Sequence, residues 1–243
     1  MHGPFRLNLI NSCADRVRIK VCGLTTEEDV FACERLGVDA VGFLLARRSS
    51  LPSGIRTNDK VTIEQAAELV RKVPATMTSV LLVHSSLSAE IRSLWSCIRP
   101  DALQLQIALT PGELTGLRRD LPSTRLIRTI HVAITDTALS VRAAVDSVIG
   151  TGIDAVLLDT GRTDRTGGTG ATHDWRISQE IVQRVSPFPV ILAGGLGALN
   201  VGAAVRSVRP YAVDALSSLK KGEGVKDHDQ IAHFVRAATV ECN

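Results

Sequence analysis

The amino-acid sequence predicts an α/β fold, a single (β/α)8 barrel of the TIM type, from three observations. Short apolar runs of strand length alternate with amphipathic helical segments along the chain. The alternation repeats eight times at even spacing, the number of units that closes a TIM barrel. Some runs, such as Ala40-Val-Gly-Phe-Leu-Leu45, are apolar throughout, as expected of strands buried on both faces of a parallel sheet. A doubly wound sheet would also alternate strands and helices, but eight equal units favour closure.

The first strand is expected at 18–22, and the helix after it at 26–36, with Thr25 or Thr26 as N-cap and Gly37 at its end. Further strands are predicted at 40–45, 78–84, 102–106, 126–132, 155–160, 190–195 and 212–218. Further helices are predicted at 63–73, 88–98, 111–119, 138–149, 174–185, 198–208 and 227–238. Residues 17–243 are therefore expected to form one barrel domain. Residues 1–16 are expected to be an N-terminal extension that is poorly ordered or lies across the barrel.

Composition excludes several classes of function. The chain has 243 residues, which suits one barrel, and 44% apolar with 22% charged residues indicates a globular, soluble protein. A net charge of +3 and only 3% aromatic residues argue against nucleic acid as a partner. The five cysteines form no CxxC pair, which suits a reducing, cytoplasmic location. The six histidines lack metal-ligand spacing, so no metal is expected, and no apolar run approaches membrane-spanning length.

Catalytic groups in a TIM barrel lie in the loops that follow the strands. The residues at these predicted positions are Cys22, Arg47, Arg48, His84, Gln104, Gln106, His131, Asp159, Gly194, Gly195, Ser217 and Ser218. The segment 46–61 is unusually long for a compact domain and is expected to be either functional or disordered.

Cys22 and Asp159 are the candidates for proton transfer. An arbitrary cysteine is most often a small buried apolar residue, but Cys22 ends a strand just before a helix, where barrel enzymes place chemistry. Asp159 ends an apolar strand, and the next predicted helix begins too far away for Asp159 to cap it. The two strands are not adjacent, so the side chains can face each other across the barrel mouth. A thiolate base and a carboxylic acid placed in this way suit an isomerisation.

Glycine and serine clusters at later strand ends predict a phosphate site. Gly194-Gly195 and Ser217-Ser218 follow the last two strands, the usual phosphate position in this fold. A glycine-rich segment, Gly167-Gly168-Thr169-Gly170, follows Asp159 and can offer backbone amides to an anion. Each cluster alone could equally reflect tight turn geometry. Together they favour a phosphorylated ligand.

Strand alternation points Lys20 inward below Cys22, on the strand that neighbours the last one once the barrel closes. Asp214 on that last strand is expected to pair with Lys20. A structural role for this pair is favoured over a catalytic one.

The chain resembles the phosphoribosylanthranilate isomerase family in a series of motifs that occur in order from about residue 17. These are Lys20-Val-Cys-Gly-Leu-Thr25 with Glu28-Asp29, Gly37-Val-Asp-Ala-Val-Gly-Phe43, Leu157-Leu-Asp-Thr160, Gly167-Gly-Thr-Gly-Ala-Thr-His-Asp-Trp175, Leu192-Ala-Gly-Gly-Leu196 with Asn200-Val201, and Gly224-Val-Lys-Asp227.

The resemblance implies a cofactor-free TIM barrel of tryptophan biosynthesis that is a monomer or a homodimer. The implied reaction is an Amadori rearrangement of N-(5-phosphoribosyl)anthranilate to 1-(2-carboxyphenylamino)-1-deoxyribulose 5-phosphate. It implies that Asp159 is the general acid that opens the ribose ring, and that Cys22 is the base that removes the proton from the sugar C2. It also places the substrate phosphate on amides around Gly194 and Gly195 and on the turn after the last strand.

One departure from the family pattern concerns the substrate carboxylate. The family has Ser-x-Arg after the second strand, and its arginine holds the anthranilate carboxylate, whereas this chain has Ser49-Ser-Leu51 in a longer loop. Arg47, Arg48 and Arg56 are the candidates to replace this arginine, with Arg48 preferred.

Two further departures lie at other strand ends. The family's Gln-Leu-His-Gly becomes Gln104-Leu-Gln-Ile107, and its Ser-Ser-Gly-x-Glu becomes Leu216-Ser-Ser-Leu-Lys220. The expected substrate contacts are accordingly Gly194, Gly195, Ser217, Ser218, Gly168, Gly170, Asp214, Arg48 and Gln104. The altered loops leave two alternatives open. One is a paralogue that acts on a different phosphoribosyl amine or sugar phosphate, and the other is a barrel that binds phosphosugars without catalysis.

Overall fold

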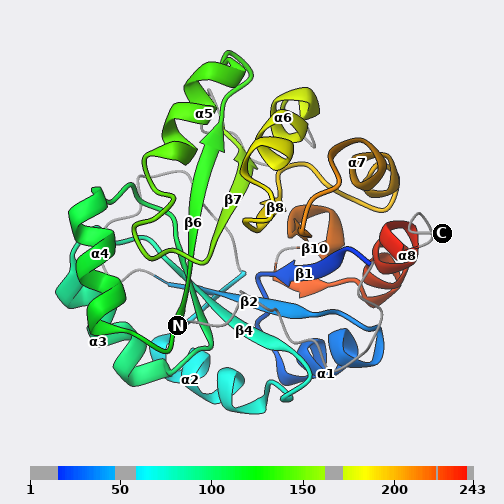
Figure 1. Ribbon diagram of the computed structural model, residues 1–243. Coiled ribbons are helices and arrows are strands. Elements are labelled where there is room, and N and C mark those ends of the chain that lie inside the picture. The colour runs from blue at the N-terminus through cyan, green and yellow to red at the C-terminus, as the bar shows by residue number, and fades with distance from the viewer. Residues whose placement is uncertain (1–15, 47–58, 162–171, 223, 240–243) are drawn as a thin grey trace.

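Parallel strands form a closed ring with helices around it (Figure 1). A computed structural model describes residues 16–46, 59–161, 172–222 and 224–239. In these ranges the ring strands are β1 (Arg18–Cys22), β2 (Ala40–Leu45), β4 (Thr78–Val83), β5 (Ala102–Leu105), β6 (Arg125–Val132), β7 (Ala155–Thr160), β8 (Val190–Leu192) and β9 (Ala212–Ala215). Each pairs in parallel with its neighbours in the order β1-β9-β8-β7-β6-β5-β4-β2, and the pairing of β1 with β2 closes the barrel. The predicted fold class is confirmed.

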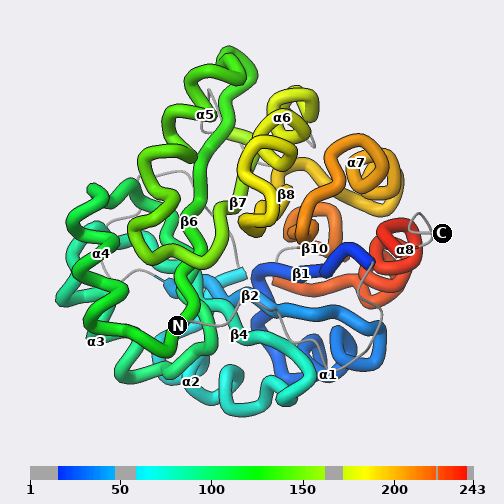
Figure 2. The backbone as a smooth tube through the Cα atoms, in the orientation of Figure 1, coloured from blue at the N-terminus to red at the C-terminus, as the bar shows by residue number. Residues whose placement is uncertain are grey.

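The described helices surround this ring, as the tube in Figure 2 also shows. They are α1 (Glu27–Arg35), α2 (Ile63–Lys72), α3 (Ser88–Ile98), α4 (Pro111–Asp120), α5 (Ala138–Asp146), α6 (Trp175–Val185), α7 (Val201–Val208) and α8 (His228–Thr239). None of them is both long enough and apolar enough to cross a membrane.

Threonine side chains begin several of these helices. Thr26 caps α1 by accepting a hydrogen bond from the Asp29 amide, which settles the choice left open between Thr25 and Thr26. Thr62 and Thr110 form capping boxes with the glutamine or glutamate three residues later, and Thr137 forms one with a serine. These local signals determine where the helices begin. They therefore also determine where the strand-to-helix loops at the barrel mouth end.

Two apolar layers stabilise the barrel. The larger lies between strands and helices and includes Val21, Phe43 and Leu103. The smaller fills the barrel interior with residues such as Ala40 and Leu157, together with Cys22. Strand alternation sends consecutive residues of each strand to opposite layers, so every second residue of a strand can contribute to the interior.

Some element boundaries differ from the sequence predictions. The strand expected at 190–195 stops at Leu192, because Gly194 and Gly195 adopt positive φ and turn the chain. The strand expected at 212–218 stops at Ala215, and Ser217–Leu219 form a short 3-10 helix, η1. The helix expected from 198 begins at Val201, because Asn200 Oδ1 accepts a hydrogen bond from the Gly197 amide and holds a turn before it.

Three short strands were not predicted. β3 (Lys60–Val61) pairs with the end of β2, and β10 (Lys220–Gly222) and β11 (Val225–Lys226) form an antiparallel hairpin after η1. In Figure 1 this hairpin lies beside β1.

Of the predicted N-terminal extension, residues 1–15 lie outside the described ranges. Arg16 is described, and its guanidinium donates to the Asp39 carboxylate at 2.9 Å and 2.5 Å.

Candidate active site

Cys22 ends β1, and its side chain belongs to the barrel interior, where only 3% of the residue is exposed. Its partner in the parallel register of β2 is Gly42. A Cβ atom added to Gly42 would lie 2.7 Å from Cys22 Sγ and 3.1 Å from Lys20 Nζ. Glycine at this position therefore leaves the space that the thiol and the ammonium group share.

The pKa of the Cys22 thiol depends on burial and on nearby charges. Burial raises this pKa to about 11, because the thiolate would lose its hydration inside the barrel. The Lys20 ammonium group lowers it by its charge and by a hydrogen bond, Asp214 raises it, and Lys226 lowers it. The value of about 11 is the net of these effects, so the two lysines oppose the effect of burial without cancelling it.

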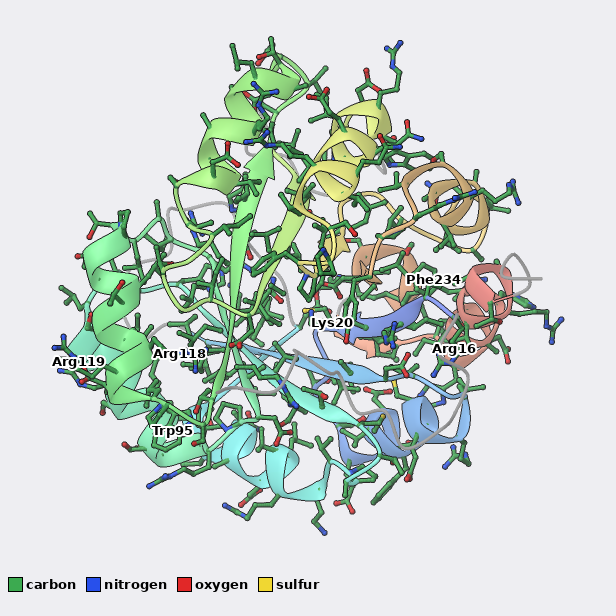
Figure 3. All side chains as sticks on the ribbon, in the orientation of Figure 1. Arg16, Lys20, Trp95, Arg118, Arg119 and Phe234 are labelled. Atoms are coloured by element: carbon green, nitrogen blue, oxygen red, sulfur yellow. The ribbon has the colours of Figure 1, made fainter. Side chains whose placement is uncertain are left out.

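The predicted ion pair below Cys22 is confirmed. Lys20 and Asp214 are register partners in β1 and β9, both are buried, and Nζ lies 2.8 Å from Oδ2. Figure 3 shows Lys20 near the centre of the ring of strands. Burial raises the pKa of Asp214, and the Lys20 charge opposes this shift. The Asp214 carboxylate binds Lys20 and also raises the pKa of Cys22 by its own charge, and its predicted contact with substrate stays a prediction.

Asp159 lies at the carboxyl end of β7, and two strands, β9 and β8, lie between β7 and β1 around the ring. Its register partner on β6 is His131, whose Nδ1 lies 4.0 Å from Asp159 Oδ2. About half of the His131 side chain and a third of the Asp159 side chain are exposed, at 50% and 36%. Cys22 and Asp159 thus occupy carboxyl ends of parallel strands at the same end of the barrel, one buried and one accessible to solvent.

The pKa of His131 is lowered, chiefly by burial and next by the charge of Arg128, while a hydrogen bond to the Gln106 backbone raises it. His131 is therefore neutral at pH 7. A neutral imidazole does not hold the adjacent Asp159 carboxylate in its ionised form, as a permanent cation would.

A buried histidine holds the end of β7 in place. His173 Nδ1 lies 2.9 Å from Thr160 Oγ1, its Nε2 lies 2.6 Å from Ser178 Oγ, and its amide donates to Thr160 Oγ1 at 3.1 Å. Burial lowers the pKa of His173, which keeps the ring neutral between these two hydroxyl groups. His173 thereby fixes the residue next to Asp159.

The neighbouring strand approaches the same threonine. A Cβ atom added to Gly194 would lie 2.2 Å from Thr160 Oγ1 and 2.3 Å from Thr160 N, and Gly194 has a φ of 86°. Only glycine fits both the close approach and the left-handed backbone. The turn after β8 is consequently packed directly against the end of β7.

The turns after β8 and β9, where a phosphate is predicted, lie together. Ser218 Oγ donates to the Leu196 carbonyl at 2.5 Å, and a Cβ atom added to Gly197 would lie 3.1 Å from Ser218 Cβ. Gly195, with a φ of 67°, continues the turn of Gly194. The structure thus brings Gly194, Gly195 and Ser218 together, and both Ser217 and Ser218 are exposed in the 3-10 turn.

A cavity of about 960 Å³ opens from these turns along α7 and α8. Its lining includes Gly195, Gly197, Ser218, Arg206 and Arg236. Neither Cys22 nor Asp159 lines it, so it adjoins the predicted phosphate position and not the reacting carbon atoms.

Gln104 points into the barrel interior, is 2% exposed, and donates from Nε2 to Thr129 Oγ1 at 3.3 Å. Its Oε1 is buried and has no hydrogen-bond partner among the described residues. This leaves an acceptor that a ligand donor could satisfy.

The predicted contacts Arg48, Gly168 and Gly170, and the alternatives Arg47 and Arg56, lie outside the described residues. Within the described ranges, no group of three or more His, Cys, Asp or Glu residues is arranged to hold a metal ion.

The site contains side chains that sequence reasoning did not assign. His131 was recognised as a strand-end residue but was given no role, and His173 and Lys226 were noticed only as parts of matching motifs. Register pairing of β6 with β7 would have pointed to His131. The contacts of His173 and Lys226 depend on loop paths that have no local sequence signal.

Comparison with known proteins gives one consistent family. The family model described as N-(5'-phosphoribosyl)anthranilate (PRA) isomerase matches residues 19–237. The chain is 37% identical over 223 residues to N-(5'-phosphoribosyl)anthranilate isomerase of Methanocella arvoryzae, covering 92% of this chain and 98% of that protein. It is 38% identical over 221 residues to the enzyme of the same name from Haloferax volcanii, covering 91% of this chain and 92% of that protein.

Solved structures agree with these sequence matches. Phosphoribosyl anthranilate isomerase from Thermotoga maritima superposes with a TM-score of 0.73 at 28% identity, covering 91% of this chain and 98% of that chain. A phosphoribosyl anthranilate isomerase in complex with reduced 1-(o-carboxyphenylamino)-1-deoxyribulose 5-phosphate gives a TM-score of 0.73 at 25% identity, with the same coverage.

Proposed function

The chain belongs to the N-(5'-phosphoribosyl)anthranilate isomerase family, and on that basis we propose that Cys22 and Asp159 perform the family's rearrangement here as general base and general acid. The activity is the conversion of N-(5'-phosphoribosyl)anthranilate to 1-(2-carboxyphenylamino)-1-deoxyribulose 5-phosphate, a step of tryptophan biosynthesis. The single observation that carries the residue assignment is the placement of these two groups at carboxyl ends of separate barrel strands.

The reaction begins with two proton transfers, one from an acid and one to a base. Asp159, in its acid form, donates a proton to the ribose ring oxygen as the C1–O bond breaks, which leaves an iminium at C1 and a hydroxyl at C4. The Cys22 thiolate then removes the proton from C2, and the electron pair of that C–H bond forms the C1–C2 double bond of an aminoenol. Protonation at C1 and loss of the proton from the C2 hydroxyl give the ketone.

The surroundings of each group fit its role. Cys22 is buried, which excludes water from the base that must act on a carbon-bound proton, and Lys20 lies close enough to hydrogen-bond the sulfur. Asp159 lies beside His131, whose lowered pKa means that no imidazolium charge favours the ionised carboxylate at neutral pH. The acid and the base thus have different electrostatic environments, as opposite roles require.

The substrate phosphate is assigned to the turns formed by Gly194, Gly195 and Ser218. What supports this is the packing of the two turns against one another and the left-handed backbone of both glycines. The absence of side chains lets an anion approach the backbone amides. Gly168, Gly170 and Ser217 are proposed to contribute to the same end of the substrate.

The carboxylate of the aromatic ring is proposed to bind Arg48, with Arg47 and Arg56 as the alternatives, because this loop replaces the family's arginine with Leu51. Single glutamine variants of the three arginines test this. A raised KM in one of them, with kcat retained, identifies the ligand of the carboxylate. An unchanged KM in all three would remove this loop from carboxylate binding.

The function is tested by following loss of anthranilate-type fluorescence when the protein is added to phosphoribosylanthranilate generated in the assay. Turnover by the wild type, with Cys22→Ser as the blank, is expected. A folded wild type that binds a product analogue and does not turn over the substrate would contradict the assignment and favour a different phosphoribosyl amine.

A cytoplasmic location is proposed from free thiols at Cys22, Cys33 and Cys97, which suit a reducing compartment.

The enzyme of Thermotoga maritima is described as dimeric. For this chain the proposal is a monomer or a homodimer, which sedimentation equilibrium distinguishes.

A further inference from the structure

Two lysine–aspartate pairs lie around the end of β1. Lys20 Nζ is 2.8 Å from Asp214 Oδ2 in the barrel interior. Lys220 Nζ is 2.6 Å from Asp59 Oδ2, where the Asp59 side chain is 1% exposed. In each pair a carboxylate matches the charge of one ammonium group, so these four groups together add no net charge.

A third lysine at the same place has no such match. Lys226 on β11 is 4% exposed, and its Nζ has no hydrogen-bond partner among the described residues. An ammonium group buried without an adjacent anion is costly, and burial accordingly lowers the pKa of Lys226. The group that most opposes this shift is Cys22, followed by Asp59.

The hairpin geometry explains why Lys226 lies near Cys22. Lys226 is the register partner of Lys220 across the β10–β11 ladder, and Lys220 reaches Asp59. The Cβ atom of Asp59 lies 3.3 Å from a Cβ atom placed on Gly23, the residue after Cys22. The hairpin is also attached to the loop after β1, since Thr25 Oγ1 donates to the Gly224 carbonyl at 3.1 Å.

We propose that Lys226 is a positioning residue whose ammonium group is the counter-charge of the Cys22 thiolate, and that it thereby sets the fraction of Cys22 available as a base. The proposal rests on the proposed function in one respect, that Cys22 is the general base. Each aspartate contacts its lysine through Oδ2, so in this cluster three lysines face two carboxylates, and ionisation of Cys22 supplies a third negative charge. When the thiol loses its proton to solvent, the S–H bond breaks, the sulfur keeps the electron pair, and the charge of Lys226 is balanced.

Besides Cys22 and Asp59, two acidic groups are near Lys226, and neither replaces Cys22. Asp29 has the weakest effect on the pKa of Lys226, and its carboxylate already contacts His228 Nε2 at 2.9 Å. Cys33 lies on the buried side of α1, and burial together with Asp29 raises the pKa of its thiol to about 12. Cys22, and not Cys33, is the thiol whose charge acts on the pKa of Lys226.

The test is a pH titration of thiolate absorbance in the ultraviolet, taken as the difference between each protein and its Cys22→Ser counterpart. Lys226→Gln should raise the pKa of Cys22 by about one unit, leaving about tenfold less thiolate at a given pH. It should lower kcat/KM about tenfold and move the pH profile toward higher pH. Lys226→Arg should retain most of the wild-type titration, and Lys221→Gln, an exposed lysine of the same hairpin, should change nothing.

An unchanged Cys22 titration in Lys226→Gln would overturn the proposal. So would a rise in KM with an unaltered titration, because this pattern means that Lys226 binds the substrate. If Lys226→Gln does not fold, Lys226→Arg is the variant that decides. A pKa of Cys22 in Lys226→Arg that rises above the wild-type value would contradict the proposal, because arginine keeps the positive charge. The titration uses no substrate, so it tests the effect of Lys226 separately from the proposed function. If the pKa of Cys22 shifts in Lys226→Gln but Cys22→Ser still turns over the substrate, Cys22 is rejected as the base and the effect of Lys226 on its pKa is upheld.

Discussion

His131 and Asp159 face each other from adjacent strands of the barrel, with Nδ1 4.0 Å from Oδ2. Because burial and Arg128 lower the pKa of His131, Asp159 has an uncharged imidazole and not a cation beside it at neutral pH. A general acid needs such a neighbour, and a cation in the same place would remove its proton.

Replacing this imidazole with a permanent charge should therefore impair the acid. His131→Lys places an ammonium group beside Asp159 and should lower the pKa of Asp159 by about 1–3 units. We expect kcat at pH 7 to fall by about tenfold or more and to recover partly at lower pH. The measurement is the pH profile of kcat.

The matched control is His131→Asn, which keeps a neutral polar side chain and should change kcat at pH 7 far less. A His131→Lys profile that coincides with that of the wild type would show that His131 has no influence on Asp159.

The close approach of β8 to Thr160 makes Gly194 sensitive to substitution. A methyl group in Gly194→Ala would overlap Thr160 backbone and side-chain atoms, so we expect a loss of about 2–4 kcal/mol in unfolding free energy and a fall in kcat from displacement of Asp159. Gly37→Ala is the control, because Gly37 has a similar φ of 78° with no atom within 4 Å of the added Cβ. Urea unfolding of both variants should show a loss of only about 1–2 kcal/mol for Gly37→Ala.

Space for the thiol is predicted to depend on Gly42. In Gly42→Ala the added methyl group would lie 2.7 Å from Cys22 Sγ, so the sulfur must move, and kcat should fall by at least about tenfold while the protein stays folded. Gly116→Ala in α4, where the nearest atom is 3.8 Å away, should keep full activity and gain about 0.5–1 kcal/mol of stability. Full activity in Gly42→Ala would mean that the observed position of Cys22 is not required.

Stability is predicted to depend on pH through His173. The folded-state pKa of this buried histidine is lowered, whereas in the unfolded chain it is about 6.5. The unfolded state therefore binds more protons as pH falls, so stability is highest above about pH 6.5 and decreases below it. His173→Gln should be less stable at pH 8 and should show a shallower loss between pH 8 and pH 5 in urea unfolding. The exposed His233→Gln should keep the wild-type slope, and an identical slope in His173→Gln would reject the prediction.

Strand patterns were sufficient to predict the barrel and part of the site. Apolar runs located the strands, and the period-2 alternation of side chains placed Lys20 below Cys22 and opposite Asp214, which the 2.8 Å ion pair confirms. Parallel strands also end at the same side of a barrel, so a cysteine and an aspartate at strand ends could be assigned to one mouth.

Contacts made by loops were beyond the reach of these patterns. His173 contacts Thr160 after a long connection, and the hairpin that carries Lys226 is joined to the loop after β1 by the hydrogen bond from Thr25 Oγ1 to the Gly224 carbonyl. Neither contact has a repeat or a period in the sequence, because each depends on the path of the backbone in space. β8 ends early because Gly194 adopts a left-handed φ. Glycine permits this conformation but does not impose it, so the sequence alone does not predict where the strand ends.

The most direct test of the acid–base assignment compares kcat with binding in Cys22→Ser and Asp159→Asn. Both variants should bind a phosphoribosyl product analogue with a Kd within a few-fold of the wild type, since neither side chain is assigned to the phosphate. Each should lose about 10²–10⁴-fold in turnover of phosphoribosylanthranilate under single-turnover conditions. Near-wild-type turnover by either folded variant would contradict the account.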